Sequence, residues 1–204
     1  CACMSAMPVP YRTCRTARLG AALSTLVLAA CASTPTPDAP RSPLLALKPS
    51  ALGCEVAVQQ RLTLKQAGKP LQQLDALLEV DAQAVRLAFF VVGQGMGSVV
   101  GDGGQLDEQL SRHWPARLVT EQILSDLQLA FWPAQNVQRA LQAPWQMDVT
   151  DSGRSLLRDG SEQVRVQFMG RDAVEITYPA GPFVLRVESP GGHQLCTSAR
   201  EPAR

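Results

Sequence analysis

Histidine, charge and aromatic residues are all scarce in this sequence. Only two histidines occur among 204 residues, His113 and His193, and they lie far apart, so a histidine-based metal site or catalytic centre has little material to draw on. Charged residues make up 18% of the chain and aromatic residues 5%, and the charged share lies below the roughly 25% of an ordinary soluble domain. The net charge is +1, which argues against the basic surface of a nucleic-acid-binding protein.

Recognisable catalytic motifs are also missing. The sequence contains neither a Gly-x-Ser-x-Gly nucleophile elbow nor a protease-like Cys and His signature. The glycine-rich segment 93–98 follows a strand pattern, but a dinucleotide fingerprint needs a helix to begin there. Another strand pattern follows instead, so we expect a flexible turn at this segment. The acidic pairs Asp107/Glu108 and Glu121/Asp126 have no evident reason to be buried, so we expect a solvated face rather than a glycosidase dyad. The sequence therefore predicts no catalytic residue, no metal ligand and no cofactor.

The first thirty residues have the layout of a secretory signal. Arg12, Arg15 and Arg18 form a basic cluster, and the apolar run 19–30 follows, with no acidic residue before position 31. A membrane-spanning helix needs roughly 20 apolar residues, which is more than this run offers. Position 1 is a cysteine, and we expect initiation at Met4 or Met7, which would give signals of ordinary length.

The end of this run, Leu28-Ala29-Ala30-Cys31, resembles a bacterial lipobox. The resemblance implies cleavage before Cys31 and acylation, by palmitate or a similar chain, of its sulfur and its new amino group. Two or more acyl chains hold a protein stably on a membrane. Ala32 follows the cysteine where an aspartate would retain a lipoprotein in the inner membrane, so the resemblance implies an outer-membrane anchor with the domain in the periplasm.

Removal of the signal changes the cysteine count. Of six cysteines, Cys1, Cys3 and Cys14 leave with the signal and Cys31 carries the lipid, which leaves Cys54 and Cys196. In an oxidising periplasm these two are expected to form a disulfide, and two separate thiols are the alternative. The same cleavage removes three arginines and no acid, so the mature chain is acidic overall.

The mature chain divides into three parts. Residues 31–50 combine the acylated cysteine with five prolines and read as an extended tether. Residues 51–196 carry the apolar patterns of a folded domain, and residues 197–204 read as a flexible tail. Together with the signal peptide 1–30, this gives four segments.

Within the domain, strand patterns surround one helical region. Apolar spacing of three to four residues predicts a helix from Leu118 to Phe131, interrupted by Pro133, and a second short helix from Ala134 to Leu141. Alternating patterns predict strands at 55–64, 71–80, 85–92, 98–100, 145–149, 155–157, 164–169, 173–178 and 183–187. The pattern indicates an α+β fold, a curved antiparallel sheet with helices packed on one side.

The segment from Ile123 to Pro133, with the strands before it and Trp145 after it, resembles a family of uncharacterised bacterial lipoproteins that is a domain of unknown function. That family is associated with gene clusters for aryl-polyene and related fatty-acid-derived lipids. The resemblance covers roughly residues 50–190. It implies a fold similar to the LolA/LolB carriers, an incompletely closed antiparallel barrel whose concave face is covered by helices.

Apolar side chains on the helix and the third strand are the candidate ligand contacts. They either fill a core or line a lipid-sized cleft, and both arrangements need the same side chains. The candidates are Leu87, Phe89, Val91, Ile123, Leu127, Ala130 and Phe131. We therefore expect an outer-membrane-anchored periplasmic lipoprotein, not an enzyme, that binds or transfers a lipid or a lipoprotein in an apolar cleft. The alternative is a structural or assembly lipoprotein that acts through protein partners without a ligand.

Overall fold

A computed structural model describes residues 42–181, 183–190, 192 and 194–196. The predicted signal peptide, the predicted lipidation site Cys31 and the tail 197–204 lie outside these residues. The described residues form ten strands, most of them with alternating apolar side chains: β1 (Val56–Gln66), β2 (Gln72–Val80), β3 (Val85–Val91), β4 (Gln94–Gly101), β5 (Leu106–Leu110), β6 (Trp145–Thr150), β7 (Gly153–Arg158), β8 (Ser161–Met169), β9 (Ala173–Tyr178) and β10 (Phe183–Glu188).

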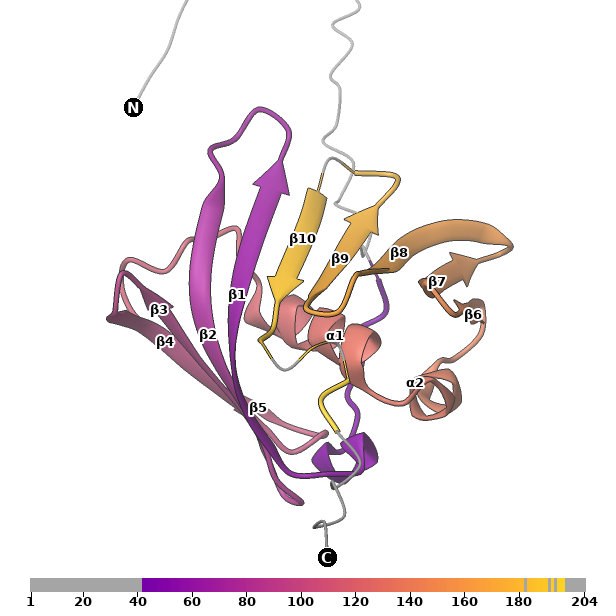
Figure 1. The fold of residues 1–204 in the computed structure, drawn as a ribbon, viewed down its shortest axis with the longest axis horizontal. Helices are drawn as coiled ribbons and strands as arrows, with labels where there is room; N and C mark the ends of the chain where they lie inside the picture. Colours follow the sequence, from indigo (N-terminus) through magenta and orange to yellow (C-terminus); the bar gives the residue numbers. More distant parts are fainter. Residues whose placement is uncertain (1–41, 182, 191, 193, 197–204) are drawn as a thin grey trace, which may run out of the picture. The chain divides into compact units, whose positions relative to one another are not determined.

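All ten strands belong to one antiparallel sheet, in the order β5-β4-β3-β2-β1-β10-β9-β8-β7-β6 (Figure 1). The sheet is curved, and its end strands β5 and β6 do not pair with each other, so it is not closed into a barrel. The two halves meet where β1 pairs with β10, from Arg61 opposite Glu188 to Gln66 opposite Phe183. The predicted class, a curved antiparallel sheet with helices, is the observed one.

The glycine-rich region after β3 differs from the prediction. Segment 94–97, expected as a turn, is part of β4, and β5, which was not predicted, pairs with it. A Cβ on Gly97 would lie 2.8 Å from Leu110 Cδ2 and 2.9 Å from the Gln109 oxygen, so glycine permits β5 to approach. Strand β5 is mostly exposed and lacks alternation, which is why its pattern gave no signal.

The helical region is close to the prediction. Helix α1 (Thr120–Phe131) begins two residues later than expected, and α2 (Ala134–Ala140) follows Pro133. The Arg154 guanidinium of β7 donates to the carbonyl oxygens of Leu129 at 2.6 Å and Trp132 at 2.7 Å. These bonds satisfy carbonyls at the end of α1 that have no partner within the helix, and they place a cation at its negative end. Burial lowers the pKa of Arg154 to about 10, so the charge persists at neutral pH.

Helix α1 is buried on nearly every side, including its polar positions. Ser125, Asp126 and Gln128 are each exposed by 2% or less, which a simple amphipathic helix would not show. The cause is the segment 42–47, which lies along the helix. The Ser125 hydroxyl accepts from the Leu45 N–H at 2.9 Å, and the Gln128 amide bonds both the N–H and the carbonyl of Leu47, at 3.3 and 3.2 Å.

The same contacts move the start of the folded domain. Residues 42–50, predicted as the end of the tether, are bonded to α1, and Leu45, Leu47 and Pro49 are buried. A Cβ on Gly103, whose φ is +92°, would lie 2.8 Å from Lys48 Cα, so the loop after β4 also packs closely on this segment. Proline content alone suggested a free tether, whereas leucines 45 and 47 provide apolar surface that α1 and the sheet bury.

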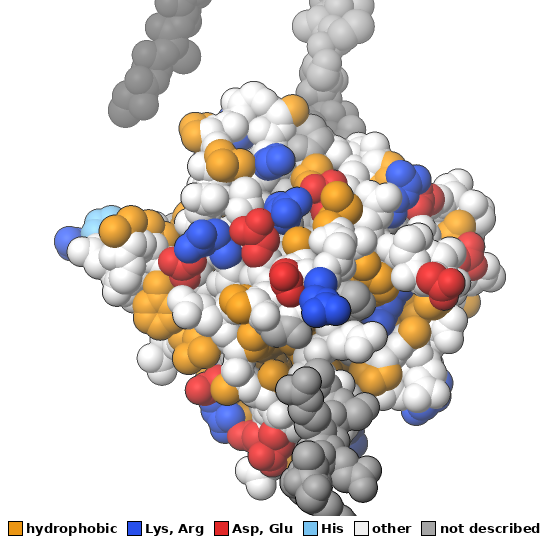
Figure 2. Space-filling model, viewed as in Figure 1, with side chains coloured by type: hydrophobic (Ala, Val, Ile, Leu, Met, Phe, Trp, Pro, Cys, Tyr) orange, Lys and Arg blue, Asp and Glu red, His pale blue; other side chains and the backbone are white. Residues whose placement is uncertain are grey.

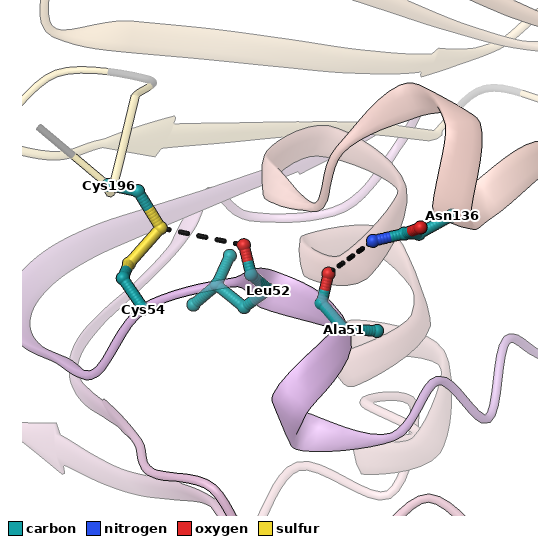
Figure 3. The surroundings of a disulfide bond; sticks show 5 residues. All are labelled: Ala51, Leu52, Cys54, Asn136 and Cys196. Atoms are coloured by element: carbon teal, nitrogen blue, oxygen red, sulfur yellow. Dashed lines mark hydrogen bonds between the residues drawn. A yellow bond between two sulfur atoms is a disulfide. The ribbon is translucent and has the colours of Figure 1, made fainter. Parts of the chain in front are cut away.

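A disulfide joins the two ends of the domain (Figure 3). Cys54 follows the short 3-10 helix η1 (Pro49–Leu52), and Cys196 lies beyond β10, with their Cα atoms 5.8 Å apart. This is the pairing expected from the sequence, and the distance falls within the range that a disulfide requires. On the other side of η1, the Asn136 amide of α2 donates to the Ala51 carbonyl at 2.6 Å.

Candidate functional site

A cavity of about 540 Å³ lies beside the first half of α1. Its walls come from the segment 42–44, the β1–β2 hairpin, the loop before α1, and the start of β10. The apolar side chains that line it are Leu44, Leu64, Pro70, Ala116, Leu118, Val119, Ile123 and Phe183. Its size falls within the range of about 300–1,000 Å³ that holds small-molecule ligands, and its lining suits an apolar one.

The mouth of this cavity exposes large apolar side chains. Leu44 is 52% exposed and Val119 is 56% exposed, and Leu71, at 55%, follows Pro70 of the lining. Two cationic residues, Lys69 and Arg117, also line this cavity. Exposed apolar groups gathered in this way are typical of surfaces that bind a ligand or a partner.

The floor of the cavity is polar. Gln122 Nε2 donates to Ser42 Oγ at 2.6 Å and to Asp126 Oδ1 at 2.9 Å, and it lies 3.2 Å from the Tyr178 hydroxyl. The Tyr178 hydroxyl also donates to Asp126 Oδ1. Burial first, and then the Asp126 carboxylate, raise the pKa of Tyr178, so the phenol remains a donor. These contacts fix the first residues of segment 42–47 to the helix and to β9.

The burial of Asp126 corrects one expectation from the sequence. Asp126 is 1% exposed and does not belong to a solvated acidic face. Its expected neighbour in that face, Glu121, is exposed. Asp126 follows the helical spacing of the apolar residues, and tertiary contacts with Tyr178 and Gln122 supply the hydrogen bonds that a buried carboxylate needs.

The predicted cleft residues separate into different places. Ile123 lines the cavity beside α1. Leu87, Phe89 and Leu127 are exposed by 1% or less within the main apolar core, and Val91 is partly buried against that core. Ala130 and Phe131 also belong to the core, and they line a different, smaller hollow that Cys196 lines as well. Phe89 packs on Trp114 with ring centroids 5.0 Å apart, which shows the kind of contact that fills the interior instead of leaving it open.

The residues at the mouth were missed by the sequence pattern. Leu44 lies in the presumed tether, Val119 at the helix start, and Phe183 at the head of the last strand, so no periodicity links them. Leu44 carried a weak signal, because Leu44 and Leu45 are out of place in a polar spacer. Only the fold brings these three positions together.

In the described ranges, no group of three or more histidine, cysteine or acidic side chains is placed to hold a metal ion.

None of the helices in the described part of the chain has the length and apolarity needed to cross a membrane.

Comparison with protein families assigns the chain to a family of unknown function. A family described as a protein of unknown function, DUF3261, matches residues 57–190, and the chain belongs to this family. The match covers both α-helices and all ten strands apart from Val56, the first residue of β1. A comparison with curated proteins finds no match.

Proposed function

We propose that this DUF3261 protein is an outer-membrane-anchored periplasmic lipoprotein that binds or transfers a lipid or an acylated molecule. The observation that carries the proposal is the apolar cavity of about 540 Å³ beside α1, with Leu44 and Val119 exposed at its mouth. Side chains of α1 and of segment 42–47 pack in one apolar core with those of the strands, and we propose that they cover the concave face of the sheet in an arrangement that resembles the LolA/LolB carriers.

The position of the cavity in the chain supports membrane access. Ser42 lines the cavity, and the proposed lipid attachment site, Cys31, precedes it closely in the sequence. At no more than about 3.6 Å per residue, the segment between them can extend at most about 40 Å. An acylated Cys31 would therefore keep the mouth of the cavity within that distance of the bilayer surface.

The mixture of groups at the mouth supports the same function. An acyl chain gains about 0.8 kcal/mol for each CH₂ group that it buries, and the apolar lining provides such a surface. Lys69 and Arg117 at the mouth are placed to attract an anionic group at the end of that chain. The polar floor formed by Gln122 and Asp126 limits how far an apolar chain can enter.

Native mass spectrometry of the periplasm-expressed protein tests the proposal. The wild type is expected to copurify with lipid, and Val119→Glu or Leu44→Glu is expected to lose it, because a carboxylate at the mouth makes entry of an acyl chain unfavourable. Both positions are more than half exposed, so the variants should fold. Val149→Glu is the matched control, since Val149 is 47% exposed and lies on β6, outside the cavity lining.

The alternative is an assembly lipoprotein that acts through protein partners. One observation favours it: Leu87, Phe89 and Leu127, predicted to line a cleft, are instead packed in the core. If neither the wild type nor Val149→Glu carries lipid, the carrier function is refuted and the assembly function gains. Lipid that remains bound in Val119→Glu and Leu44→Glu would show that the cavity is not the site.

A further inference from the structure

The two ends of the sheet differ in charge. Because neighbouring strands are antiparallel, successive turns lie alternately at one end of the strands and at the other (Figure 1). The β1–β2 turn 67–71, the β3–β4 turn 92–93 and the connection 111–119 from β5 to α1 lie at one end, and we call these three segments the loop face. The loop face contains three cations, Lys69, Arg112 and Arg117, and no acid.

The turns at the opposite end of the strands are acidic. Segments 81–84, 102–105, 151–152 and 170–172 contain four aspartates and one cation, namely Asp81, Asp102, Asp151, Asp172 and Arg171. Two further turns lie at the same end as the loop face. Segment 179–182 has no charged residue, and Asp159 of segment 159–160 lies 3.9 Å from Arg158. The strands therefore run between a basic end and an acidic end.

The cations of the loop face have no acidic partner. In the part of the chain that the structure describes, Lys69, Arg112 and Arg117 are exposed and form no ion pair. By contrast, five arginines of the strands each pair with an acid: Arg61, Arg86, Arg158, Arg165 and Arg186. Figure 2 shows basic and acidic side chains interspersed over the middle of the sheet, whereas at the left edge a basic side chain and a histidine project without an acid beside them.

The acids nearest to the loop face in the sequence are engaged elsewhere. Glu108 accepts a hydrogen bond from the Thr120 hydroxyl. Glu121 lines a small cavity together with Gly103, which belongs to a turn at the acidic end. The three cations are therefore free to attract an anion from outside the domain.

Large apolar side chains are exposed on the same loops. Leu71 is 55% exposed, Val119 56% and Val92 93%. Val92 has a φ of +49°, a conformation that glycine and asparagine adopt more easily than valine, so the turn itself gives no reason for valine at this position. Exposed aliphatic side chains insert among lipid headgroups, and cations beside them are attracted to anionic lipids.

We propose that the loop face docks on the surface of a bilayer that contains anionic phospholipid. The negative potential of such a surface attracts the free cations and repels the aspartates of the opposite end, so charge alone orients the domain. Each basic residue near the surface strengthens binding about fivefold. Three of them are therefore expected to give a preference of at least about tenfold over a neutral bilayer.

The course of the chain favours a bilayer over an acidic protein as the partner. Ser42 and Leu44 line the cavity beside α1 together with Lys69 and Arg117, so the chain that precedes Ser42 enters the domain at the loop face. The proposed anchor, Cys31, closely precedes Ser42 in the sequence and would hold this end of the domain toward the membrane. Docking goes beyond the proposed function, because it requires no ligand in the cavity.

Sedimentation with vesicles tests the proposal. The protein used is the mature chain with Cys31→Ser, exported behind a signal that lacks a lipobox, so that no acyl chain contributes to binding. The vesicles consist of phosphatidylcholine alone or of phosphatidylcholine with phosphatidylglycerol. The protein is expected to bind the vesicles with phosphatidylglycerol at least about tenfold more tightly at low ionic strength, and added salt is expected to reduce this difference.

A double variant, Leu71→Ser/Arg112→Gln, removes one apolar side chain and one cation from the loop face. It is expected to bind the vesicles with phosphatidylglycerol at least about tenfold more weakly than the wild type. The matched control is Val149→Ser/Arg171→Gln, which makes equivalent changes at exposed positions outside the loop face and is expected to bind as the wild type does. None of these four residues lines the cavity beside α1, so lipid copurification is expected to persist in both variants, and failure of docking is distinguishable from failure of the cavity.

Hydrogen exchange of the vesicle-bound wild type gives a second measurement that needs no variant. Amides in 67–71 and 111–119 are expected to exchange more slowly than in the free protein, and amides in 81–84 and 102–105 at an unchanged rate. Equal binding to both kinds of vesicle, or binding to neither, would overturn the proposal and leave an acidic protein as the partner to test. An equal loss of binding in the two double variants, or equal slowing of exchange at both ends of the sheet, would overturn it as well.

Discussion

Removal of the disulfide between Cys54 and Cys196 should destabilise the domain strongly. The bond closes a loop of 142 residues, for which the chain-entropy model gives about 5 kcal/mol of stabilisation through the unfolded state. For a domain of this size, each kcal/mol shifts the melting temperature by roughly 2–4 °C. The Cys54→Ala/Cys196→Ala double variant is therefore expected to melt roughly 10–20 °C below the wild type.

The structure indicates where the effect will concentrate. The disulfide holds the segment after η1 against residues 195–196, and Cys196 Sγ lies 3.5 Å from the Leu52 carbonyl oxygen (Figure 3). On its other side, η1 remains bonded through Ala51 to Asn136 at 2.6 Å. The double variant should therefore keep its sheet and lose stability mainly through a more expanded unfolded state.

Urea denaturation followed by circular dichroism is the appropriate assay. The double variant should unfold at a lower urea concentration and with a larger m-value, because its unfolded chain exposes more surface. Wild-type protein unfolded in the presence of a reductant is the control, and its curve should approach that of the double variant. An unchanged urea midpoint in the double variant would refute the loop-entropy argument for this domain.

Three further predictions concern other parts of the chain. Gln128→Leu leaves the N–H and carbonyl of Leu47 without their partners and should lower the free energy of unfolding, measured in urea, by roughly 2–4 kcal/mol. The control is Gln135→Leu, at an exposed position on α2. An equal loss of stability in both variants would contradict the role of segment 42–47. Hydrogen bonds from the Arg86 side chain first, and then from the N–H groups of Gln83 and Ala84, lower the pKa of Asp81 from 3.8 to about 2. The folded-state pKa lies below the unfolded one, so the stabilisation from ionised Asp81 is complete above pH 3.8 and disappears as the pH falls through about 2. Asp81→Asn should therefore remove the change in unfolding free energy that the wild type shows between these pH values. An Asp81 carboxyl that titrates near 3.8 by NMR would contradict this prediction. Cys31→Ala should yield protein that lacks acyl chains, and recovery of that variant with the outer membrane after detergent-phase separation would contradict the lipobox assignment.

Local patterns in the sequence determined most of the secondary structure. Strands β2, β3, β9 and β10 and both helices lie within a few residues of their predicted bounds, because alternation and helical spacing are properties of neighbouring residues. The disulfide partners also followed from the sequence, once the other four cysteines were assigned to the signal and the anchor. The class of fold followed from the order of these elements.

Tertiary structure decided which apolar residues are core and which line a cavity. Leu127 and Ile123 lie one helical turn apart, have the same local pattern and both belong to the core, yet Ile123 also lines the cavity and Leu127 does not. Strand β5, the packing of segment 42–47 and the burial of Asp126 likewise depend on residues distant in the sequence, namely Gly97, Gln128 and Tyr178. Burial is set by what the rest of the chain places over a residue, and a local pattern does not contain that information.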